Sequence, residues 1–160
     1  MTTDEPVQWL ILGRYRVLGE LGRGAMGIVY KVHDERLDRV VALKTIRKDR
    51  FIAAGVPEEE VLERFRREAR AAGKLSHSGI VTIYDISEEG DDLYLTMELV
   101  DGAPLSERMR ATPRVPVAEA ARIGTRICDA LAYAHAHGVI HRDVKPDNIM
   151  LSKGSDSVLL

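Results

Sequence analysis

The pattern of apolar and polar positions in the first fifty residues predicts three β-strands. Residues 15–21 and 28–32 are rich in β-branched and aromatic side chains, and the glycine-rich stretch between them predicts a hairpin turn. A second turn is expected at residues 34–39, before the largely apolar run 40–46. We therefore expect the chain to open with a hairpin and a third, mostly buried strand.

The third strand carries one cation, Lys44, in the middle of an apolar run. Because side chains alternate along a strand, Lys44 shares a face with Ala42 and Ile46. A single lysine on a strand usually faces solvent. Here, however, the apolar residues on the same face favour a buried lysine that has a negatively charged partner.

Two later segments repeat their apolar residues at the spacing of a helix. Pro57 suits the first helical position of residues 57–72, and Gly73 suits the end of that helix. Residues 117–137 show the same periodicity and are followed by Gly138, a typical helix terminator. The two apolar stripes consist of Leu62, Phe65, Ala69 and Ala72, and of Ala120, Ile123, Ile127, Leu131 and Ala134.

The charges of the first helix indicate which residue could pair with Lys44. Glu68 has only a weak, reversed pairing with Arg64, and it flanks the apolar stripe, so it is the best candidate to face Lys44. The alternative is a solvated glutamate on an arginine-rich surface. Other glutamates of the helix already have favourable partners four residues away, namely Glu60 with Arg64 and Glu63 with Arg67.

The glycine-rich turn contains Gly22, Gly24 and Gly27. A dinucleotide-binding fingerprint would be followed by a helix, whereas a strand follows here, and a P-loop would end in Gly-Lys-Ser/Thr, which is missing. Two interpretations stay open from the turn alone. It is an ordinary hairpin, or its glycines let the backbone approach the phosphates of a ligand.

A loop rich in reactive groups follows the second helix. Asp143, Lys145 and Asn148 lie between that helix and the apolar run 149–151, and His141 and Arg142 precede them. Each residue alone could belong to ordinary turn chemistry. Together, a carboxylate, an ammonium and an amide are sufficient for phosphoryl transfer, which depends mainly on positioning and electrostatic stabilisation.

This series of motifs resembles that of eukaryotic-type (Hanks-type) serine/threonine protein kinases, in particular the bacterial branch, over residues 14–160. The resemblance implies an α+β, protein-kinase-like fold. Residues 1–13 would be an N-terminal extension. Residues 14–100 would form the ATP-binding small lobe, an antiparallel sheet with one main helix, and residues 101–160 would form the hinge exit, the first helical part of the large lobe and the catalytic loop.

The resemblance also implies the roles of single residues. Lys44 would hold the α- and β-phosphates of ATP and pair with Glu68. Asp143 would accept or orient the proton of the substrate hydroxyl, Lys145 would contact the γ-phosphate, and Asn148 would bind Mg²⁺. A lysine at position 145 resembles kinases specific for serine and threonine.

The implied nucleotide pocket draws on several segments. Its members are Leu21, Gly22, Arg23, Gly24, Ala25, Met26 and Gly27 over the phosphates, Val29, Ala42 and Met150 around the adenine, Met97 at the back, and Glu98 to Val100 as the hinge. The resemblance thus implies ATP and Mg²⁺ as cofactors and proteins with serine or threonine as substrates. A kinase homodimer is a further possibility.

The last residues resemble the strand that leads into Asp-Phe-Gly in this family, so the chain is expected to stop before that magnesium ligand. Negligible turnover is therefore expected of these 160 residues alone. Two alternatives to an active kinase are a non-catalytic module that binds nucleotide or another kinase, and a kinase fragment without a function of its own.

Composition narrows the remaining classes. A net charge of -2 gives no reason to expect nucleic acid as a partner, and the apolar run at residues 7–12 is too short to span a bilayer and is expected to pack on the small lobe. The single cysteine, Cys128, excludes an internal disulfide and suits the reducing cytosol, so a cytoplasmic location is expected. We expect Cys128 to pack in the core.

Overall fold

The computed structural model of the 160-residue chain describes residues 10–24, 27–48, 57–112, 114–153 and 158–159. Contacts between Cα atoms divide the chain into two compact units. Unit 1 consists of residues 1–66 and 83–99, and unit 2 consists of residues 67–82 and 100–160. The lobe boundaries inferred from the sequence stay a prediction.

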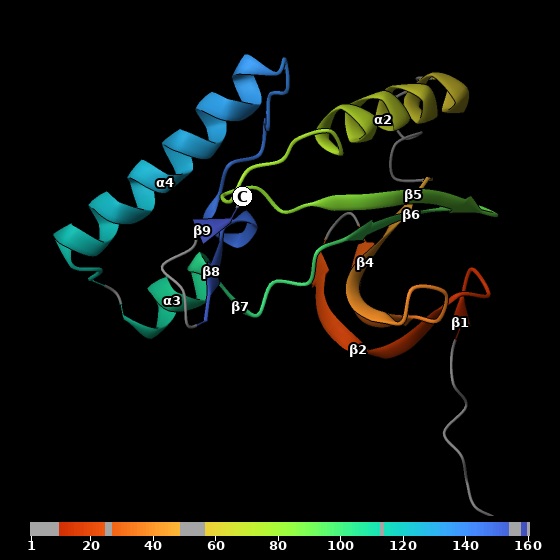
Figure 1. The fold of residues 1–160 in the computed structure, drawn as a ribbon, viewed down its shortest axis with the longest axis horizontal. Coiled ribbons are helices and arrows are strands. Elements are labelled where there is room, and N and C mark those ends of the chain that lie inside the picture. The colour runs from red at the N-terminus through yellow and green to blue at the C-terminus, as the bar shows by residue number, and fades with distance from the viewer. Residues whose placement is uncertain (1–9, 25–26, 49–56, 113, 154–157, 160) are drawn as a thin grey trace, which may run out of the picture. The chain divides into compact units, whose positions relative to one another are not determined.

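Unit 1 is built on a six-stranded antiparallel sheet with the order β1-β2-β3-β4-β6-β5, and Figure 1 shows that the sheet is strongly curved. The three strands predicted from the sequence and the glycine-rich hairpin are confirmed. The sequence did not predict β1, β5 or β6. The strands are β1 (Leu10–Ile11), β2 (Tyr15–Gly24), β3 (Gly27–Asp34), β4 (Arg39–Arg47), β5 (Ile83–Glu89) and β6 (Asp92–Met97).

The core of unit 1 lies on one face of these strands. Its buried members are Tyr15, Val32, Val41 and Leu43. Ile11 and Leu12 pack against them, which confirms the expected packing for the described end of the run 7–12. Residues 7–9 of that run lie outside the described part of the chain.

The turn between β3 and β4 is organised by a buried carboxylate, Asp34. Arg14 donates two hydrogen bonds to it, at 2.8 and 2.6 Å, and the backbone N–H groups of Arg36 and Leu37 donate two more. These donors lower the pKa of Asp34, the Arg14 guanidinium contributing most. The fully buried charge is thereby satisfied, and the predicted turn at residues 34–39 is confirmed.

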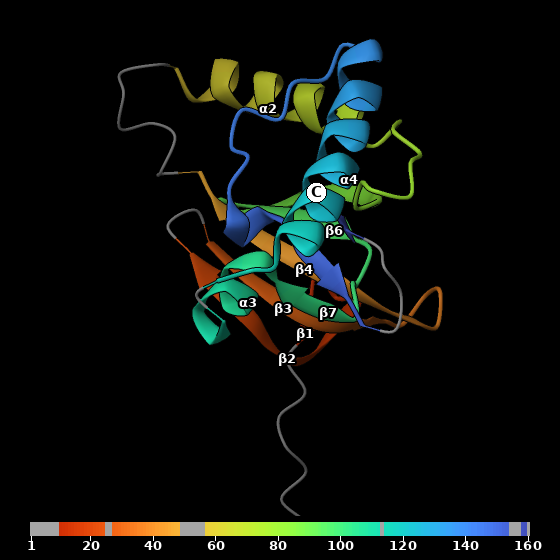
Figure 2. The same cartoon turned by 90° about the vertical axis from the view of Figure 1, so that its left-hand side faces the viewer.

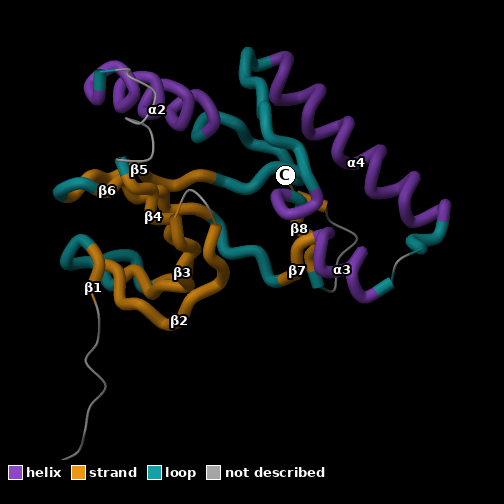
Figure 3. Tube along the Cα trace, turned by 180° about the vertical axis from the view of Figure 1, so that it is seen from behind, coloured by secondary structure: helices purple, strands orange, loops and turns teal. Residues whose placement is uncertain are grey.

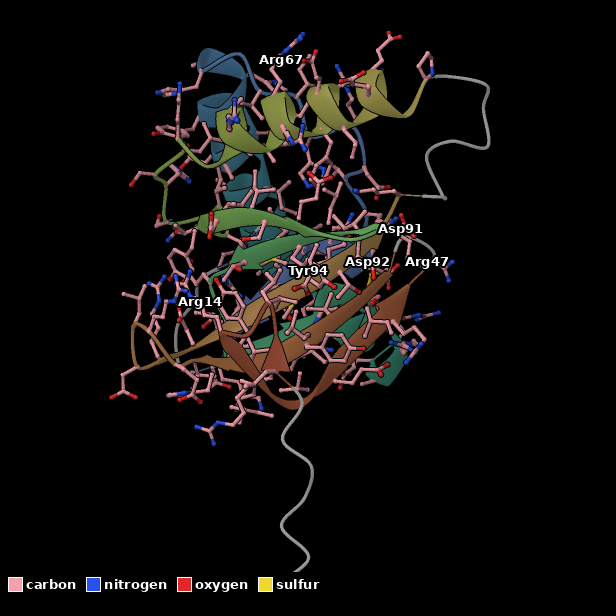
Figure 4. The ribbon with its side chains drawn as sticks, turned by 90° about the vertical axis from the view of Figure 1, so that its right-hand side faces the viewer. Arg14, Arg47, Arg67, Asp91, Asp92 and Tyr94 are labelled. Carbon is pink, nitrogen blue, oxygen red and sulfur yellow. The ribbon has the colours of Figure 1, made fainter. Side chains whose placement is uncertain are left out.

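The opposite end of β4 is fastened to the β5–β6 hairpin. Arg47 lies opposite Asp92 in the β4–β6 ladder, and Figure 4 shows both at the same edge of the sheet. Lys48 follows and is buried, with its Nζ 2.5 Å from an oxygen of Glu88. The second oxygen of Glu88 accepts a hydrogen bond from Arg66, which belongs to helix α2 (Glu58–Ala72). One carboxylate therefore links the end of β4, strand β5 and this helix.

Helix α2 contributes its first residues to unit 1 and its last residues to unit 2. The predicted apolar stripe is its less exposed side, with Ala69 buried and Leu62, Phe65 and Ala72 partly buried, and the helix ends immediately before Gly73 as expected.

Unit 2 combines two further helices with a three-stranded antiparallel sheet of order β7-β8-β9 (Figures 1 and 2). Ile123 and Ile149 form its buried cluster, against which Leu105, Ile127 and Leu151 pack. The elements are β7 (Gly102–Pro104), α3 (Leu105–Ala111), α4 (Val117–Ala136), the 3₁₀-helix η1 (Pro146–Asn148), β8 (Met150–Ser152) and β9 (Val158–Leu159).

The predicted second helix corresponds to α4, and its buried residues are Ile123, Ala130 and Ala134. Gly138 follows the helix with φ +75°, a left-handed conformation that glycine adopts without a steric penalty, so its role as terminator is confirmed. Cys128 is exposed, and the expectation that it packs in the core was wrong. It stands two residues before Ala130, about 200° around the helix, and therefore faces away from the buried side. No helix within the described ranges is both long and apolar enough to cross a membrane.

Candidate active site

One face of the unit 1 sheet brings together four of the residues predicted to contact nucleotide. Lys44 lies opposite Val29 in the β3–β4 ladder, and Ala42 lies opposite Met97 in the β4–β6 ladder. Residues that are directly opposite share a face, and so do residues two apart on one strand. Val29, Ala42, Lys44 and Met97 therefore lie on the same face, with Ala42 buried and the other three partly exposed.

The glycine-rich turn leads into this face. Gly22 lies opposite Val29, and the β2–β3 ladder continues to the pair Gly24–Gly27. Arg23 forms an ion pair with Glu20, and both side chains are exposed. This ion pair lies on the surface of the hairpin. Leu21 is half exposed, and the predicted members Ala25 and Met26 lie outside the described residues.

The reactive loop of unit 2 connects α4 to β8, and Figure 3 shows it as a loop segment interrupted by the single turn of η1. Pro146 begins that turn, where the missing N–H of a proline costs nothing. Asn148 donates its backbone N–H to the Lys145 carbonyl at 2.9 Å and so closes the turn. Ile149 follows immediately and is buried beside Ile123 of α4, and its carbonyl accepts the Leu105 N–H at 2.7 Å. The loop is thus attached to the core directly beyond its polar residues.

Three of the predicted catalytic residues converge within this loop. Lys145 donates from Nζ to Oδ2 of Asp143 at 2.7 Å, and Asn148 donates from Nδ2 to the same oxygen at 2.9 Å. The Asn148 amide nitrogen also lies 2.8 Å from the Asp143 carbonyl oxygen. The carboxylate, ammonium and amide that the sequence places in one loop therefore meet at one carboxylate oxygen, a convergence that the sequence did not specify.

The electrostatics of the loop keep this carboxylate ionised. The hydrogen bond from Lys145 is the main cause that lowers the pKa of Asp143, and the hydrogen bond from Asn148 adds to it. His141, whose Nδ1 accepts the Asp143 backbone N–H at 3.3 Å, is shifted for a different reason: burial lowers the pKa of its imidazole. Neutral His141 acts as a backbone acceptor that helps to hold Asp143.

Glu68 has a partner that the sequence did not predict. Its Oε1 accepts a hydrogen bond from Arg142 at 2.8 Å, and both side chains are more than half exposed. Arg142 itself has φ +63°, an uncommon conformation for a residue with a side chain. That backbone conformation is not visible in a residue pattern, and no signal in the sequence could have indicated the contact. The expected pairing of Glu68 with Lys44 stays a prediction.

The remaining predicted residues lie at the ends of strands. Glu98 directly follows β6 in unit 1, and Val100 stands shortly before β7 in unit 2. Met150 begins β8, where it pairs with Pro104 of β7 and Leu159 of β9. The hinge role of Glu98 and Val100 and the adenine contact of Met150 stay predictions.

Comparison with known proteins identifies the family to which this geometry belongs. Residues 15–159 match the family model of the protein kinase domain. The chain belongs to the protein kinase family. This confirms the resemblance seen in the sequence, and it agrees with the α+β, kinase-like fold of an antiparallel sheet and few helices.

Bacterial protein kinases are among its relatives. The probable serine/threonine-protein kinase pknA2 of Bifidobacterium longum is 41% identical over 152 residues, which cover 95% of this chain and 20% of that protein. The serine/threonine-protein kinase PrkC of Bacillus subtilis is 43% identical over 141 residues, covering 88% of this chain and 21% of that protein. This kinase chain therefore spans about a fifth of the length of these relatives.

A solved kinase domain has the same fold. The crystal structure of the PknI kinase domain of Mycobacterium tuberculosis matches with a TM-score of 0.83 and 34% sequence identity, covering 96% of this chain and 60% of that one. The structural similarity therefore extends over nearly the whole of this chain.

The protein kinase family uses ATP and Mg²⁺, and the donor set of the loop fits these groups. Mg²⁺ prefers oxygen ligands and usually binds through one or two side chains together with substrate phosphates and water. The Asp143 carboxylate and the Asn148 amide supply such oxygens. Within the described ranges, no group of three or more His, Cys, Asp or Glu side chains could hold a metal ion.

Proposed function

We propose that this protein is a serine/threonine protein kinase, which transfers the γ-phosphate of ATP to serine or threonine hydroxyls of other proteins. The observation that carries the proposal is the convergence of Lys145 and Asn148 on one carboxylate oxygen of Asp143. The names of the bacterial relatives support the substrate class.

In the proposed reaction, Asp143 orients the substrate hydroxyl and accepts its proton. The hydroxyl oxygen forms a bond to the γ-phosphorus while the bond from that phosphorus to the β,γ-bridging oxygen breaks, so the products are a phosphoprotein and ADP. The low pKa of Asp143 means that the carboxylate is ionised and able to accept a hydrogen bond at neutral pH. Lys145, beside it, supplies the positive charge that would meet the γ-phosphate.

The nucleotide is proposed to lie on the unit 1 face that carries Val29, Ala42, Lys44 and Met97. Three of these side chains offer apolar contact to a base, and Lys44 offers a cation to the phosphates. The glycine-rich turn would cover the phosphates from the end of the β2–β3 hairpin. The pairing of Lys44 with Glu68 belongs to the same proposal.

Asn148 is proposed to hold Mg²⁺ through its amide oxygen, since its nitrogen is engaged with Asp143. When bound, the metal neutralises negative charge on the phosphates. The role of the chain is to keep the amide in place, and the tight η1 turn and buried Ile149 do so.

A second candidate function is nucleotide binding without phosphate transfer. It is favoured by the arrangement of the nucleotide-facing residues, because Val29, Ala42, Lys44 and Met97 all belong to unit 1. None of these four residues belongs to the reactive loop. The two further expectations, a homodimer and a cytoplasmic location, stay proposals.

Phosphate transfer from labelled ATP to a generic basic protein tests the proposal. If the proposed function holds for these 160 residues, we expect Mg²⁺-dependent labelling by the wild-type chain, contrary to the negligible turnover expected from the sequence. Asp143→Asn should then lose about 100-fold or more of this labelling, because the variant has no carboxylate to take the proton. Asp147→Asn is the matched control, since Asp147 is an exposed acid in the same turn. It should retain the wild-type rate.

The outcomes separate the two functions. Equal labelling by wild type and Asp143→Asn would remove Asp143 from the mechanism. ATP binding without labelling would support the nucleotide-binding module instead. Labelling by the wild-type chain would also overturn the expectation of negligible turnover for these 160 residues.

A further inference from the structure

Beside the glycine-rich turn, the β3–β4 ladder ends in hydrogen bonds between a side chain and the backbone of the opposite strand. Its last backbone pair is Val29 with Lys44, and one step further the side chain of Thr45 bonds to the opposite strand. The Thr45 hydroxyl accepts the backbone N–H of Ile28 at 3.2 Å and lies 3.2 Å from the Ile28 carbonyl oxygen, to which it donates. A hydroxyl has one donor and two acceptor sites, so it can make both bonds at once.

The backbone of Thr45 also touches the turn. A Cβ atom built on Gly27 would lie 1.7 Å from the Thr45 carbonyl oxygen, so no side chain fits at this position. Gly27 has φ +148°, which is itself a conformation that favours glycine. Thr45 therefore contacts two successive residues, Gly27 and Ile28, where the turn passes into β3.

The other glycines of the turn have no comparable contact. A Cβ atom on Gly22 or Gly24 would meet nothing within 4 Å among the described residues. The β2–β3 pairing continues to Gly24 and Gly27, so the described glycine-rich end of β2 pairs with the segment that Thr45 contacts. The Thr45 contacts thus add to the backbone pairing of Val29 with Lys44 in joining the start of β3 to β4.

We propose that Thr45 is a positioning residue for the phosphate-binding turn. By holding Ile28 and Gly27, it fixes the turn next to Lys44, the preceding residue on β4, so that the turn backbone and the Lys44 ammonium face the same phosphates. This inference rests on the proposed nucleotide-binding role of unit 1. Thr45 touches no ligand in this scheme, and its effect is to preorganise the groups that do.

Calorimetric titration of the chain with ATP and with adenosine tests the proposal. Thr45→Val has nearly the same shape as threonine but lacks the hydroxyl, and we expect it to bind ATP about threefold to tenfold more weakly, as for the loss of one hydrogen-bond anchor. Adenosine has no phosphates, so its affinity should change by less than about twofold. Thr45→Ser keeps the hydroxyl and should restore ATP binding.

Thr96→Val is the matched control. Thr96 lies on β6 of the same sheet, and its buried hydroxyl has no hydrogen-bond partner among the described residues. The same substitution there should leave the affinities for ATP and adenosine unchanged.

Two results would overturn the proposal: an unchanged ATP affinity in Thr45→Val, or an equal loss for ATP and adenosine, which would indicate only a general structural role. A wild-type chain that binds neither ligand would contradict the proposed function itself and remove the basis of this inference.

Amide exchange in the wild-type chain gives a second test that needs no variant. Ile28 should be protected, and exchange at the rate of an unstructured peptide would show that the Thr45 anchor does not exist in solution.

Discussion

At the scale of single residues, the polar contacts of the reactive loop converge on the Oδ2 atom of Asp143. Lys145 and Asn148 both donate to it, and the Asp143 backbone N–H is bonded to His141. These contacts fix the carboxylate in one orientation and stabilise its charged form. A residue with this environment is suited to accept a hydrogen bond from an incoming hydroxyl at neutral pH.

The first prediction concerns this charge. Lys145→Met removes the group that contributes most to the low pKa of Asp143, so that pKa should rise toward the ordinary value for aspartate. A carboxyl-detected NMR titration of wild type and variant measures the change. Lys153→Met, a lysine beyond the reactive loop, is the control and should leave the Asp143 titration unchanged. An unshifted Asp143 in Lys145→Met would show that the ion pair does not persist in solution.

The sequence predicted that these residues share one loop, and the structure brings them together because they are close in the chain. Asp143, Lys145 and Asn148 span six positions, so one turn is enough to bring them together. The contact of Glu68 with Arg142 crosses 74 positions and depends on a left-handed backbone at Arg142, and no local pattern encodes either. The burial of Cys128 was wrongly predicted from the residue type, because free cysteine is usually buried, whereas position 128 lies off the apolar stripe of α4.

At the scale of elements, helix α2 is tied to the sheet of unit 1 by one carboxylate. Glu88 of β5 pairs with buried Lys48 beyond β4 and with Arg66 of α2. The hydrogen bond from Lys48 is the main cause that lowers the pKa of Glu88, followed by that from Arg66. This network stabilises the attachment of the helix that also carries Glu68.

The second prediction is a pH dependence of stability. Because the pKa of Glu88 is lower in the folded chain than in the unfolded chain, its contribution is complete above the unfolded value of about 4.3 and is lost as the pH falls through the folded pKa. Glu88→Gln should lower the free energy of unfolding by about 1 kcal/mol at pH 7. The difference from wild type should shrink between about pH 5 and pH 3.

Urea unfolding at pH 7, 5 and 3 measures this effect. Glu89→Gln is the control, because Glu89 is exposed, is the next residue on β5 and points to the other side of the strand. A Glu88→Gln variant with wild-type stability at pH 7 would show that the network contributes nothing. A difference that persists at pH 3 would show that the effect does not come from the charge of Glu88.

At the scale of the whole molecule, the two units differ in the length of their strands and in how completely their core residues are buried. Val32, Val41, Leu43 and Tyr15 of unit 1 are no more than 1% exposed and belong to strands of eight to ten residues. The sheet of unit 2 has strands of only two or three residues. Longer ladders over a completely buried core open less often.

The third prediction follows from this difference. Amides of β3 and β4 should exchange with solvent more slowly than those of β7 and β8, because their opening requires exposure of the unit 1 core. Hydrogen exchange of the intact chain, followed by mass spectrometry, compares the two sheets in one sample. Equal or slower exchange in β7 and β8 would contradict the prediction.

The sequence by itself determined the family, the three strands around the glycine-rich hairpin, helices α2 and α4, and the composition of the reactive loop. Those features depend on local patterns. These patterns are the periodicity of strands and helices, glycine at positions where the backbone turns, and the reactive-loop residues that lie within a few positions of one another. The tertiary structure alone decided strands β1, β5 and β6, the links through Asp34 and Glu88, and the anchoring of Gly27 and Ile28 by Thr45. These depend on ladder register and on side chains that are far apart in the chain, and a linear pattern of residues does not specify which of them meet.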